Sequence, residues 1–491
     1  MKKLLLFAGI IFSASVLAYK PAPFNQHNYS ASHERATLPA SYDSRDLGII
    51  LPARDQGKSG CCWAFTATDV AQALFHKNGF NTGYLAPQIY PNCAIGYLDL
   101  GMNTGGNEYI AISTNLLLKA PVYASKVGEF NVNDNECPDY SKEDIAGYVL
   151  STSDLPKYDA IAIKEAIMKY GSVISSIYMP TDYIYNESKP LVYIPSKDTI
   201  PTNHAVNIIG WNDSKECWIV KNSWGKDWGN KGTFNVSYKD FYIAKACVSL
   251  NSFVEADLID KVYTYNTAGL TGGYMGLKDG GNKPHSILIA HNIEKGESVE
   301  YVATYIQNPN TKIQVIVQYE GDNVIYVGKE EMVKYPGVHL HKLTTPVVSN
   351  GETLLFEIIY TSETASPVAT EIERPGYNTI ELNENQWFYI NRQWMPATNL
   401  GYNFILYVYT KEKNTTDIEE NNASDSKAIT ASGINSDIWN NAIRINIFDV
   451  SGRNIGTINP GETLPSLNAG YYVLVIDKKD GGFSIEKFNV L

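Results

Sequence analysis

Three short stretches, far apart in the chain, place a cysteine, a histidine and an asparagine in settings that suit one another. The first is residues 56–65, which contains Cys62 and leads into a segment without glycine or proline until Gly79. Apolar residues such as Phe65 and Val70 recur there at the spacing of one helical face, which predicts a helix that begins near Cys62. The positive end of a helix dipole favours a thiolate. The stretch therefore predicts a reactive cysteine.

A histidine that could pair with Cys62 must come from another part of the chain. His76 lies on the same predicted helix, several turns away, and cannot fold back. His204 lies in a segment that is typical of a strand, and residues 217–222 are typical of its hairpin partner. This hairpin would place Asn222 beside His204, where an amide oxygen can accept the ring N–H and fix the tautomer.

These residues resemble the papain family of cysteine peptidases. The resemblance implies that Cys62 is the nucleophile, that His204 is the general base and acid, and that Asn222 orients His204. It also implies that the Gln56 side chain and the Cys62 backbone N–H stabilise the oxyanion. Trp224 would cover the hydrogen bond between histidine and asparagine. The implied fold is a helical half and a β-barrel half with the site between them.

The resemblance extends over residues 38–255, about half of the chain. Thr104-Gly105-Gly106 is similar to the family's wall for the substrate backbone, so Gly105 and Gly106 are expected to bind substrate. Two departures are clear. Ser59 and Asn103 stand where the family has a pair of cysteines, so one of its disulfides is lost as a whole. Cys61 replaces a serine and is expected to be a bystander.

Three further residues are expected to contact substrate. Glu108 and Ser176 fall near positions that line the pocket for the second residue upstream of the cut, and Asn203 precedes the expected base. The pocket is therefore predicted to be more polar than usual and to accept a basic or polar side chain.

The N-terminus predicts export. Residues 1–18 combine a basic start, an apolar run and small residues before Tyr19, as in a secretory signal peptide. Residues 19–37 form a short polar leader, too small for an independent inhibitory domain. We expect the protein to be secreted or held on a bacterial cell surface.

Six cysteines in an exported chain suggest disulfide bonds. Cys62 must stay free to react, and the family resemblance implies a bond between Cys93 and Cys137. Cys217 and Cys247 are left either as a second pair or as buried thiols. No CxxC spacing is present, so neither a zinc site nor a cofactor is expected.

Residues 256–410 have a different texture, in which short alternating strands are separated by turn residues. The region resembles the lectin-like β-sandwich found beside some bacterial papain-like peptidases, and the resemblance implies glycans as candidate partners. Trp387 and Trp394 would then stack on sugars, or else they are structural aromatic residues. His339 and His341 share one face of a strand, but with no third ligand in view no metal site is predicted.

The C-terminal part consists of a polar linker, residues 411–432, and a small β-domain, residues 433–491. The β-domain resembles the C-terminal sorting domain of the type IX secretion system of Bacteroidota. This resemblance implies contact with the secretion machinery, followed by removal of the domain. Another small immunoglobulin-like module is the alternative.

The predicted fold class is therefore multi-domain: an α+β papain-like peptidase, an antiparallel β-sandwich and a small C-terminal β-domain. The predicted function is a secreted cysteine endopeptidase that acts on proteins or peptides. A formal charge of −12 argues against nucleic acid as a partner. The alternatives are a surface adhesin or glycan-binding protein whose peptidase domain is inactive, and a transglutaminase-like Cys-His-Asp enzyme, against which residues 222–225 argue.

Overall fold

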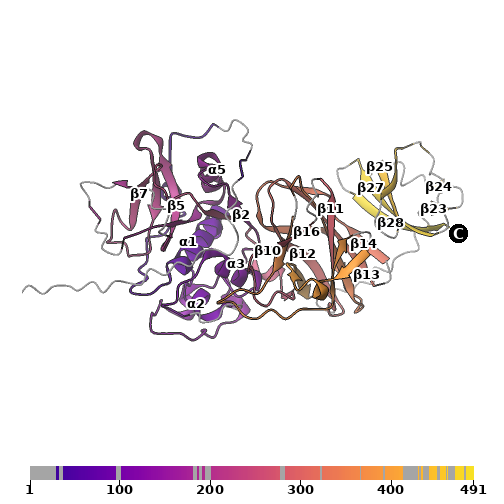
Figure 1. Cartoon of the computed structure of the whole chain (residues 1–491), viewed down its shortest axis with the longest axis horizontal. Coiled ribbons are helices and arrows are strands. Elements are labelled where there is room, and N and C mark those ends of the chain that lie inside the picture. Colours follow the sequence, from indigo (N-terminus) through magenta and orange to yellow (C-terminus); the bar gives the residue numbers. More distant parts are fainter. Residues whose placement is uncertain are drawn as a thin grey trace, which may run out of the picture.

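The computed structural model describes most of the chain between residues 29 and 490, and Figure 1 shows its arrangement. The described residues are 29–31, 37–94, 101–180, 185–186, 191–193, 201–276, 282–320, 323–364, 367–390, 393–412, 429–430, 433–434, 442–449, 454–460, 462, 470–479 and 483–490. The predicted signal peptide, most of the leader and most of the linker lie outside them. None of the helices in these ranges has the length and apolar character needed to cross a bilayer.

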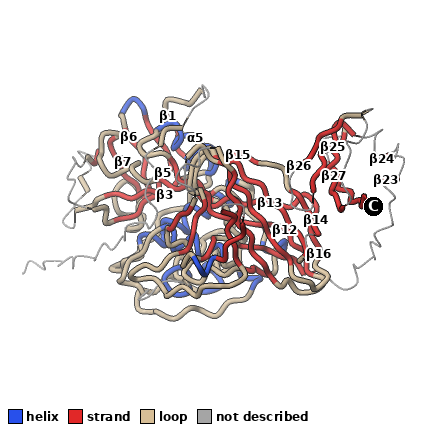
Figure 2. Tube along the Cα trace, turned by 45° about the vertical axis from the view of Figure 1, so that its right-hand side comes forward, coloured by secondary structure: helices blue, strands red, loops and turns tan. Residues whose placement is uncertain are grey.

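The helices gather in the N-terminal unit (Figure 2). The longest helix, α1, begins at the residue for which the sequence predicted a helix start, and nearly all of its side chains are buried. Asn107 caps α3 and Asp159 caps α5, each by accepting backbone N–H groups of the first turn. The α-helices are α1 Cys62–Lys77, α2 Ile89–Cys93, α3 Glu108–Leu116, α4 Ala124–Val127 and α5 Ala160–Tyr170. The short 3-10 turns are η1 Ser44–Leu47, η2 Lys142–Asp144, η3 Asp213–Lys215, η4 Ala256–Leu258 and η5 Ala397–Asn399.

One sheet completes the N-terminal unit. Among the described residues it has eight strands in the order β2-β8-β3-β5-β6-β7-β4, with β1 paired to β5. All pairs are antiparallel except β4 with β7. The strands are β1 Ser41–Asp43, β2 Thr152–Leu155, β3 Val173–Ile177, β4 Leu191–Val192, β5 His204–Asn212, β6 Cys217–Lys221, β7 Thr233–Ser237 and β8 Cys247–Leu250. Strand β5 lies at the centre and packs against α1, so this contact joins the helical half to the sheet.

Two antiparallel sheets follow, packed face to face as a sandwich. Along the strands, buried inner residues alternate with more exposed outer residues, as in β17, where every second side chain is buried. The first sheet contains β9 Lys261–Tyr263, β10 Gly273–Met275, β12 Glu297–Ile306, β16 Gly337–Val348, β18 Val368–Glu371, β21 Asn403–Phe404 and β22 Tyr407–Glu412. The second contains β11 Pro284–His291, β13 Thr311–Tyr319, β14 Asn323–Val327, β15 Glu331–Val333, β17 Leu354–Thr361, β19 Gln386–Ile390 and β20 Gln393–Pro396.

The N-terminal unit and the sandwich share one hydrophobic core. Tyr301, Tyr305, Tyr407 and Tyr409 of the first sandwich sheet belong to the same buried cluster as the side chains of α1 and α3. Hydrogen bonds also cross the boundary. The Tyr409 hydroxyl donates to Leu116 O at 3.1 Å. The two parts are therefore fused through their interiors.

The C-terminal part contains β23 Ile429–Thr430, β24 Gly433–Ile434, β25 Ala442–Asp449, β26 Asn454–Ile458, β27 Gly470–Lys478 and β28 Phe483–Val490. The last four form one antiparallel sheet in the order β26-β25-β27-β28. Its buried residues, among them Ile445, Ile447 and Leu474, make a small cluster of their own. It is drawn at the right of Figure 1, beyond the sandwich.

Two sequence-based boundaries differ from the structure. Helical spacing predicted a helix over residues 155–170, but α5 begins only at Ala160, because Pro156 interrupts the segment and Asp159 caps the helix. The linker was expected from residue 411, yet β22 continues to Glu412, because Lys411 and Glu412 still pair with β12.

Candidate active site

The loop before α1 holds the candidate nucleophile in place. Cys62 is the first residue of α1 and is fully buried. The Gly60 N–H donates to Met102 O at 2.6 Å. The neighbouring thiol of Cys61 points to Met102 as well, with its Sγ 3.4 Å from Met102 O. Burial raises the pKa of Cys61 to about 12.

The candidate base lies at the start of β5, directly beside α1. His204 Nε2 is 2.8 Å from Asn222 Oδ1, which comes from the end of β6. Asn222 Oδ1 also accepts the Ser223 N–H at 2.9 Å, so its carbonyl oxygen is the atom turned to the ring. Because an amide oxygen can only accept, His204 carries its proton on Nε2 in the neutral form and keeps a lone pair on Nδ1. That Nδ1 is buried and has no hydrogen-bond partner among the described residues.

An indole covers this pair. The Trp224 ring lies 4.9 Å from the His204 ring, centroid to centroid, at an interplanar angle of 31°. Trp228 packs edge-on against Trp224 at 5.0 Å and fixes it from behind. His204 and Asn222 are both buried, and a hydrogen bond in such a site is electrostatically stronger than in water.

Gln56 is tied to the same segment. Its Oε1 accepts the Ser223 hydroxyl at 2.6 Å, and its Nε2 donates to Ser59 O at 2.8 Å. Its backbone N–H donates to Ser223 O at 2.8 Å. With Oε1 occupied, the amide orientation is fixed, and Nε2 has a second hydrogen to donate.

The protonation of the site follows from its burial. Burial raises the pKa of the Cys62 thiol to about 11, while backbone hydrogen bonds, first that of Ala205, lower it. Burial lowers the pKa of His204 to about 4, while the hydrogen bond to Asn222 raises it. Each group alone is therefore held neutral.

Gly105 and Gly106, the expected binding segment for the substrate backbone, pack against the start of α1. Gly105 has φ +73°, which favours glycine. A Cβ on Gly106 would lie 2.4 Å from the Trp63 ring, so no side chain fits there unless the ring moves. The backbone of this segment therefore lies close to the start of α1.

The other expected substrate contacts have different settings. Glu108 is the first residue of α3, is buried, and lines a small pocket together with Asp154, Lys157 and Lys245. Ser176 is buried in β3 and pairs with Ala205, the residue after the candidate base.

The side chain of Asn203 has structural partners. Its Oδ1 accepts from Met179 N at 2.7 Å and its Nδ2 donates to Met179 O at 2.8 Å. Together with the Asn203 N–H, which donates to Ile177 O at 3.2 Å, these bonds hold the loop before β5.

A buried ion cluster behind the site was not expected from the sequence. Asp69 of α1 lies 2.7 Å from Lys221 Nζ and 3.3 Å from Arg54. Lys221 precedes Asn222, and Arg54 lies two residues before Gln56. One carboxylate thus connects the helix of Cys62 to both of its partner segments. A single acidic residue in an otherwise apolar helix face was the available signal, because a buried charge needs a partner.

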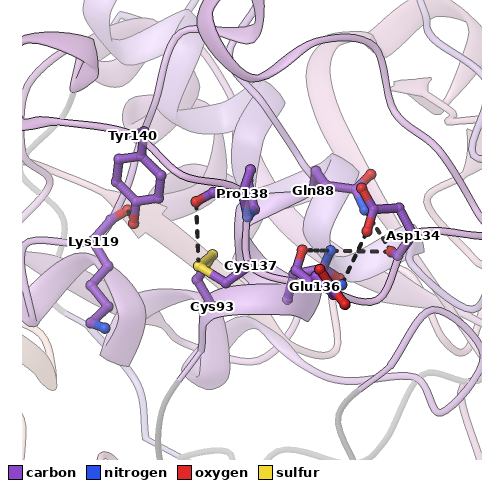
Figure 3. Close-up of a disulfide and its surroundings, with 9 residues drawn as sticks. Gln88, Cys93, Lys119, Asp134, Glu136, Cys137, Pro138 and Tyr140 are labelled. Carbon is purple, nitrogen blue, oxygen red and sulfur yellow. Dashed lines mark hydrogen bonds between the residues drawn. A yellow bond between two sulfur atoms is a disulfide. The ribbon is translucent and has the colours of Figure 1, made fainter.

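The six cysteines divide into one disulfide and four free thiols. Cys93 is bonded to Cys137 (Figure 3), and the segment before Cys137 is held by Gln88, whose Nε2 donates to Asp134 O at 2.9 Å. Cys217 and Cys247 are both buried and unbonded, so the structure corresponds to the buried-thiol alternative for these two residues.

Comparison with known proteins gives a consistent result for the N-terminal unit. Residues 38–251 match the family model described as papain family cysteine protease. Thiol protease aleurain of Arabidopsis thaliana is 32% identical over 212 residues, 41% of this chain and 56% of that protein. Cathepsin K of Mus musculus is 28% identical over 197 residues, 40% of this chain and 58% of that protein. The chain spans a little over half the length of these curated relatives.

Two solved structures share the fold over more of the chain. The clostridial cysteine protease Cwp84 after propeptide cleavage has a TM-score of 0.66 at 21% identity and covers 76% of this chain and 99% of its own. A structure of the cysteine protease and lectin-like domains of Cwp84, a surface layer associated protein of Clostridium difficile, has a TM-score of 0.67 at 19% identity and covers 82% and 94%. Residues 38–251 thus match a papain family cysteine protease domain, and antiparallel β-sheet domains follow it.

Proposed function

We propose that the protein is a secreted cysteine endopeptidase that uses Cys62, His204 and Asn222. One observation carries the proposal. The Nε2 of His204 is hydrogen-bonded to Asn222 Oδ1 at 2.8 Å, whereas the buried Nδ1 of the same ring has no hydrogen-bond partner among the described residues. Cys62 is at the start of the helix that packs on β5, and the backbone of Ala205 contributes to its pKa. A lone pair beside a thiol at a helix N-terminus is suited to take the thiol proton.

The reaction proceeds in two halves. The Cys62 proton moves to His204 Nδ1, and the thiolate attacks the carbonyl carbon of the peptide bond. Gln56 Nε2 and the Cys62 N–H donate to the resulting oxyanion. The tetrahedral intermediate collapses, and His204 returns the proton to the leaving amine. Water, deprotonated by His204, then attacks the acyl-enzyme thioester and releases the acid product and the free thiol.

The test compares two adjacent cysteines in the full chain. Cys62→Ala is expected to abolish cleavage of a peptide library and labelling by an epoxide inhibitor of the E-64 type. Cys61→Ala is the matched control and is expected to keep most of the activity, because its thiol points to Met102. Activity retained by Cys62→Ala would refute the mechanism. If only Cys61→Ala lost activity, the nucleophile would be Cys61 and not Cys62.

The substrate pocket beside Glu108 is proposed to favour a basic or polar residue two positions before the cut. Glu108 brings a buried carboxylate to a pocket that also contains charges of both signs. Positional scanning should show that Glu108→Gln reduces cleavage after Lys or Arg at that position more than after Gln. A strict preference of the native protein for large apolar residues would exclude the proposal.

Export and sorting are proposed for the two ends of the chain. The apolar segment 1–18 would direct export, residues 411–432 would act as a linker, and residues 433–491 would be recognised by type IX secretion machinery and removed. The separate core of the C-terminal sheet supports this division, and Cwp84 is itself described as surface layer associated. In a type IX-competent host, deletion of 433–491 should leave the protein inside the cell envelope. Unchanged release would exclude the sorting role.

A glycan-binding role of residues 256–410 is the second candidate, and one observation favours it. Tyr389 and Trp394 form an exposed ring pair on the β19–β20 hairpin, 5.1 Å between centroids. Such exposed rings suit stacking on sugar faces. A glycan array should give signals that Trp394→Ala removes and Cys62→Ala leaves. If the native protein binds no glycan while it cleaves peptides, only the peptidase remains.

A further inference from the structure

Two histidines and a glutamate meet at one edge of the sandwich. His339 and His341 lie two residues apart on β16 of the first sheet, so their side chains share one face. Glu331 comes from β15 of the second sheet. The sequence showed only the two histidines, and the third group reaches them because the two sheets come together here.

The three side chains point their donor atoms at one another. Glu331 Oε1 lies 2.6 Å from His341 Nδ1, and Glu331 Oε2 lies 3.0 Å from His339 Nε2. One nitrogen or oxygen from each of the three falls within 4.8 Å of the others. His339 Nε2 is buried and, despite its short distance to the carboxylate, makes no well-directed hydrogen bond within the described part of the chain.

The surroundings orient His341 as a metal ligand would be oriented. Its Nε2 is 2.8 Å from the Tyr326 hydroxyl, so Nε2 can carry the proton and donate it to the phenol oxygen. In the structure Nδ1 makes a hydrogen bond with Glu331 Oε1 at 2.6 Å, and a bound ion would take the place of the proton in that bond. A ligating histidine commonly donates its other ring N–H to a neighbouring acceptor in this way. Gly328 leaves room for the ring, because a Cβ there would lie 2.8 Å from His341 Nε2.

We propose that Glu331, His339 and His341 form a binding site for a divalent transition metal ion, with Zn²⁺ as the best match. Two imidazoles and one carboxylate suit Zn²⁺, held at about 2.0–2.2 Å, with a fourth position left for water. Such bonds set neighbouring donors roughly 3.3 Å apart in a tetrahedron. Glu331 is 38% exposed, so its carboxylate can retreat by the roughly 0.3–0.7 Å that this spacing requires. Ca²⁺ does not match, because it takes about 6–8 oxygen ligands.

The metal would stiffen the segment that docks on the peptidase domain. Between β15 and β16 the chain reaches Pro336, whose carbonyl accepts the Asp154 N–H at 2.8 Å. The Val338 N–H donates to Thr152 Oγ1 at 3.0 Å. His339 is the next residue. An ion that joins β15 to β16 therefore fixes both ends of the turn that touches β2.

The experiment uses the full-length chain without a histidine tag and with Cys62→Ala, so that the reactive thiol does not bind metal. Zn²⁺ is the probe. After dialysis against Zn²⁺ and removal of excess, elemental analysis should find about one zinc per chain. Glu331→Gln and His339→Ala should each reduce this to background. Glu330→Gln is the matched control, because its exposed carboxylate pairs with Lys312, and it should keep the ion.

Thermal unfolding supplies a second measurement. Zn²⁺ should raise the melting temperature of the native sandwich and of Glu330→Gln, and EDTA should reverse the rise, because an ion bound only to the folded state stabilises it. Glu331→Gln, which keeps the shape of the side chain, should show no rise. Zinc binding that is equal in all four proteins, or absent from the native chain, would overturn the proposal.

Discussion

The sandwich and the C-terminal sheet are both antiparallel β-structures, yet they relate to the rest of the chain in opposite ways. The sandwich contributes Tyr305, Tyr407 and Tyr409 to the core of the protease domain. The C-terminal sheet buries Ile445, Ile447 and Leu474 in a cluster that, over the residues described, includes no side chain from another part. The first is an integral part of one folded body, and the second is an attached module.

This comparison shows that a change in sequence pattern along the chain need not mark the edge of an independently folded domain. The sequence changes character near residue 255, but the hydrophobic cluster continues across that point. Near residue 412 the composition turns polar, and there the core does end. An addition can be removed without harm only where no buried side chain has its partner on the other side.

Truncation should give the largest effect. Residues 38–255 alone would expose the apolar face that the sandwich tyrosines cover, so we expect an aggregated chain without cooperative unfolding. Deletion of 413–491 should leave the melting temperature and peptide cleavage unchanged. Calorimetry of both shortened chains checks this. A stable, active fragment 38–255 would show that the shared cluster is not required.

Single core substitutions should separate the two regions next. Tyr305→Ala should cost about 3–5 kcal/mol, because it empties a fully buried site between two domains. Leu474→Ala should cost about 2–5 kcal/mol, but only in a transition that belongs to the C-terminal sheet. Urea unfolding followed by protease-domain tryptophan fluorescence distinguishes them. A shift of that signal in Leu474→Ala would mean that the C-terminal sheet is coupled after all.

A buried carboxylate should give an intermediate effect at the junction. Asp154 Oδ2 accepts the hydroxyl of Tyr109 at 2.8 Å and that of Tyr305 from the sandwich. Asp154→Asn should lose about 1.5–3 kcal/mol, because a charged acceptor is replaced by a neutral one. Tyr305→Phe, which removes one of the two donors, should lose less. If both variants lost the same free energy of unfolding, the hydrogen bond from Tyr305 would account for the whole contribution of Asp154.

The partly buried ion pairs of the junction should give the smallest effect. Burial raises the pKa of Asp260, but hydrogen bonds from Lys142, the Glu412 N–H and Lys411 outweigh it, so its pKa lies below the usual 3.8. A lowered carboxyl pKa stabilises the fold above about pH 3.8, and this stabilisation is lost as the pH falls through the folded-state value.

Asp260→Asn should therefore cost up to about 1 kcal/mol at pH 7 and nothing at low pH. Urea titrations of native and variant protein at the two pH values measure the difference. A difference that persists when Asp260 is protonated in both states would point to packing instead of charge.

Prediction from the sequence went furthest where chemistry demands particular residue types. The stretches around Cys62, His204 and Asn222 combine residue types that a thiol nucleophile, its base and an orienting amide require together. The helix and hairpin that carry them follow from local periodicity. The papain-family match of residues 38–251 and the antiparallel β-sheets that follow were predicted at this level and are confirmed.

The remaining features depend on contacts between distant segments. Nothing local marks Glu331 as a neighbour of His339, because β15 and β16 lie in different sheets. Asp69 and Asp154 likewise acquire their roles only from partners far away in the chain. The predicted start of α5 was wrong because the helical spacing of residues 155–159 outweighed the Pro156 signal.

Asp154 has a consequence for how cleavage preference could change over time. The same residue lines the pocket beside Glu108 and receives a hydroxyl from the sandwich. Under the substrate role proposed for this pocket, a substitution on β12 that never touches a bound peptide would shift one of its walls. Selection acting on the sandwich would then alter which peptides are cut. The properties of the sandwich and the cleavage preference would be inherited together.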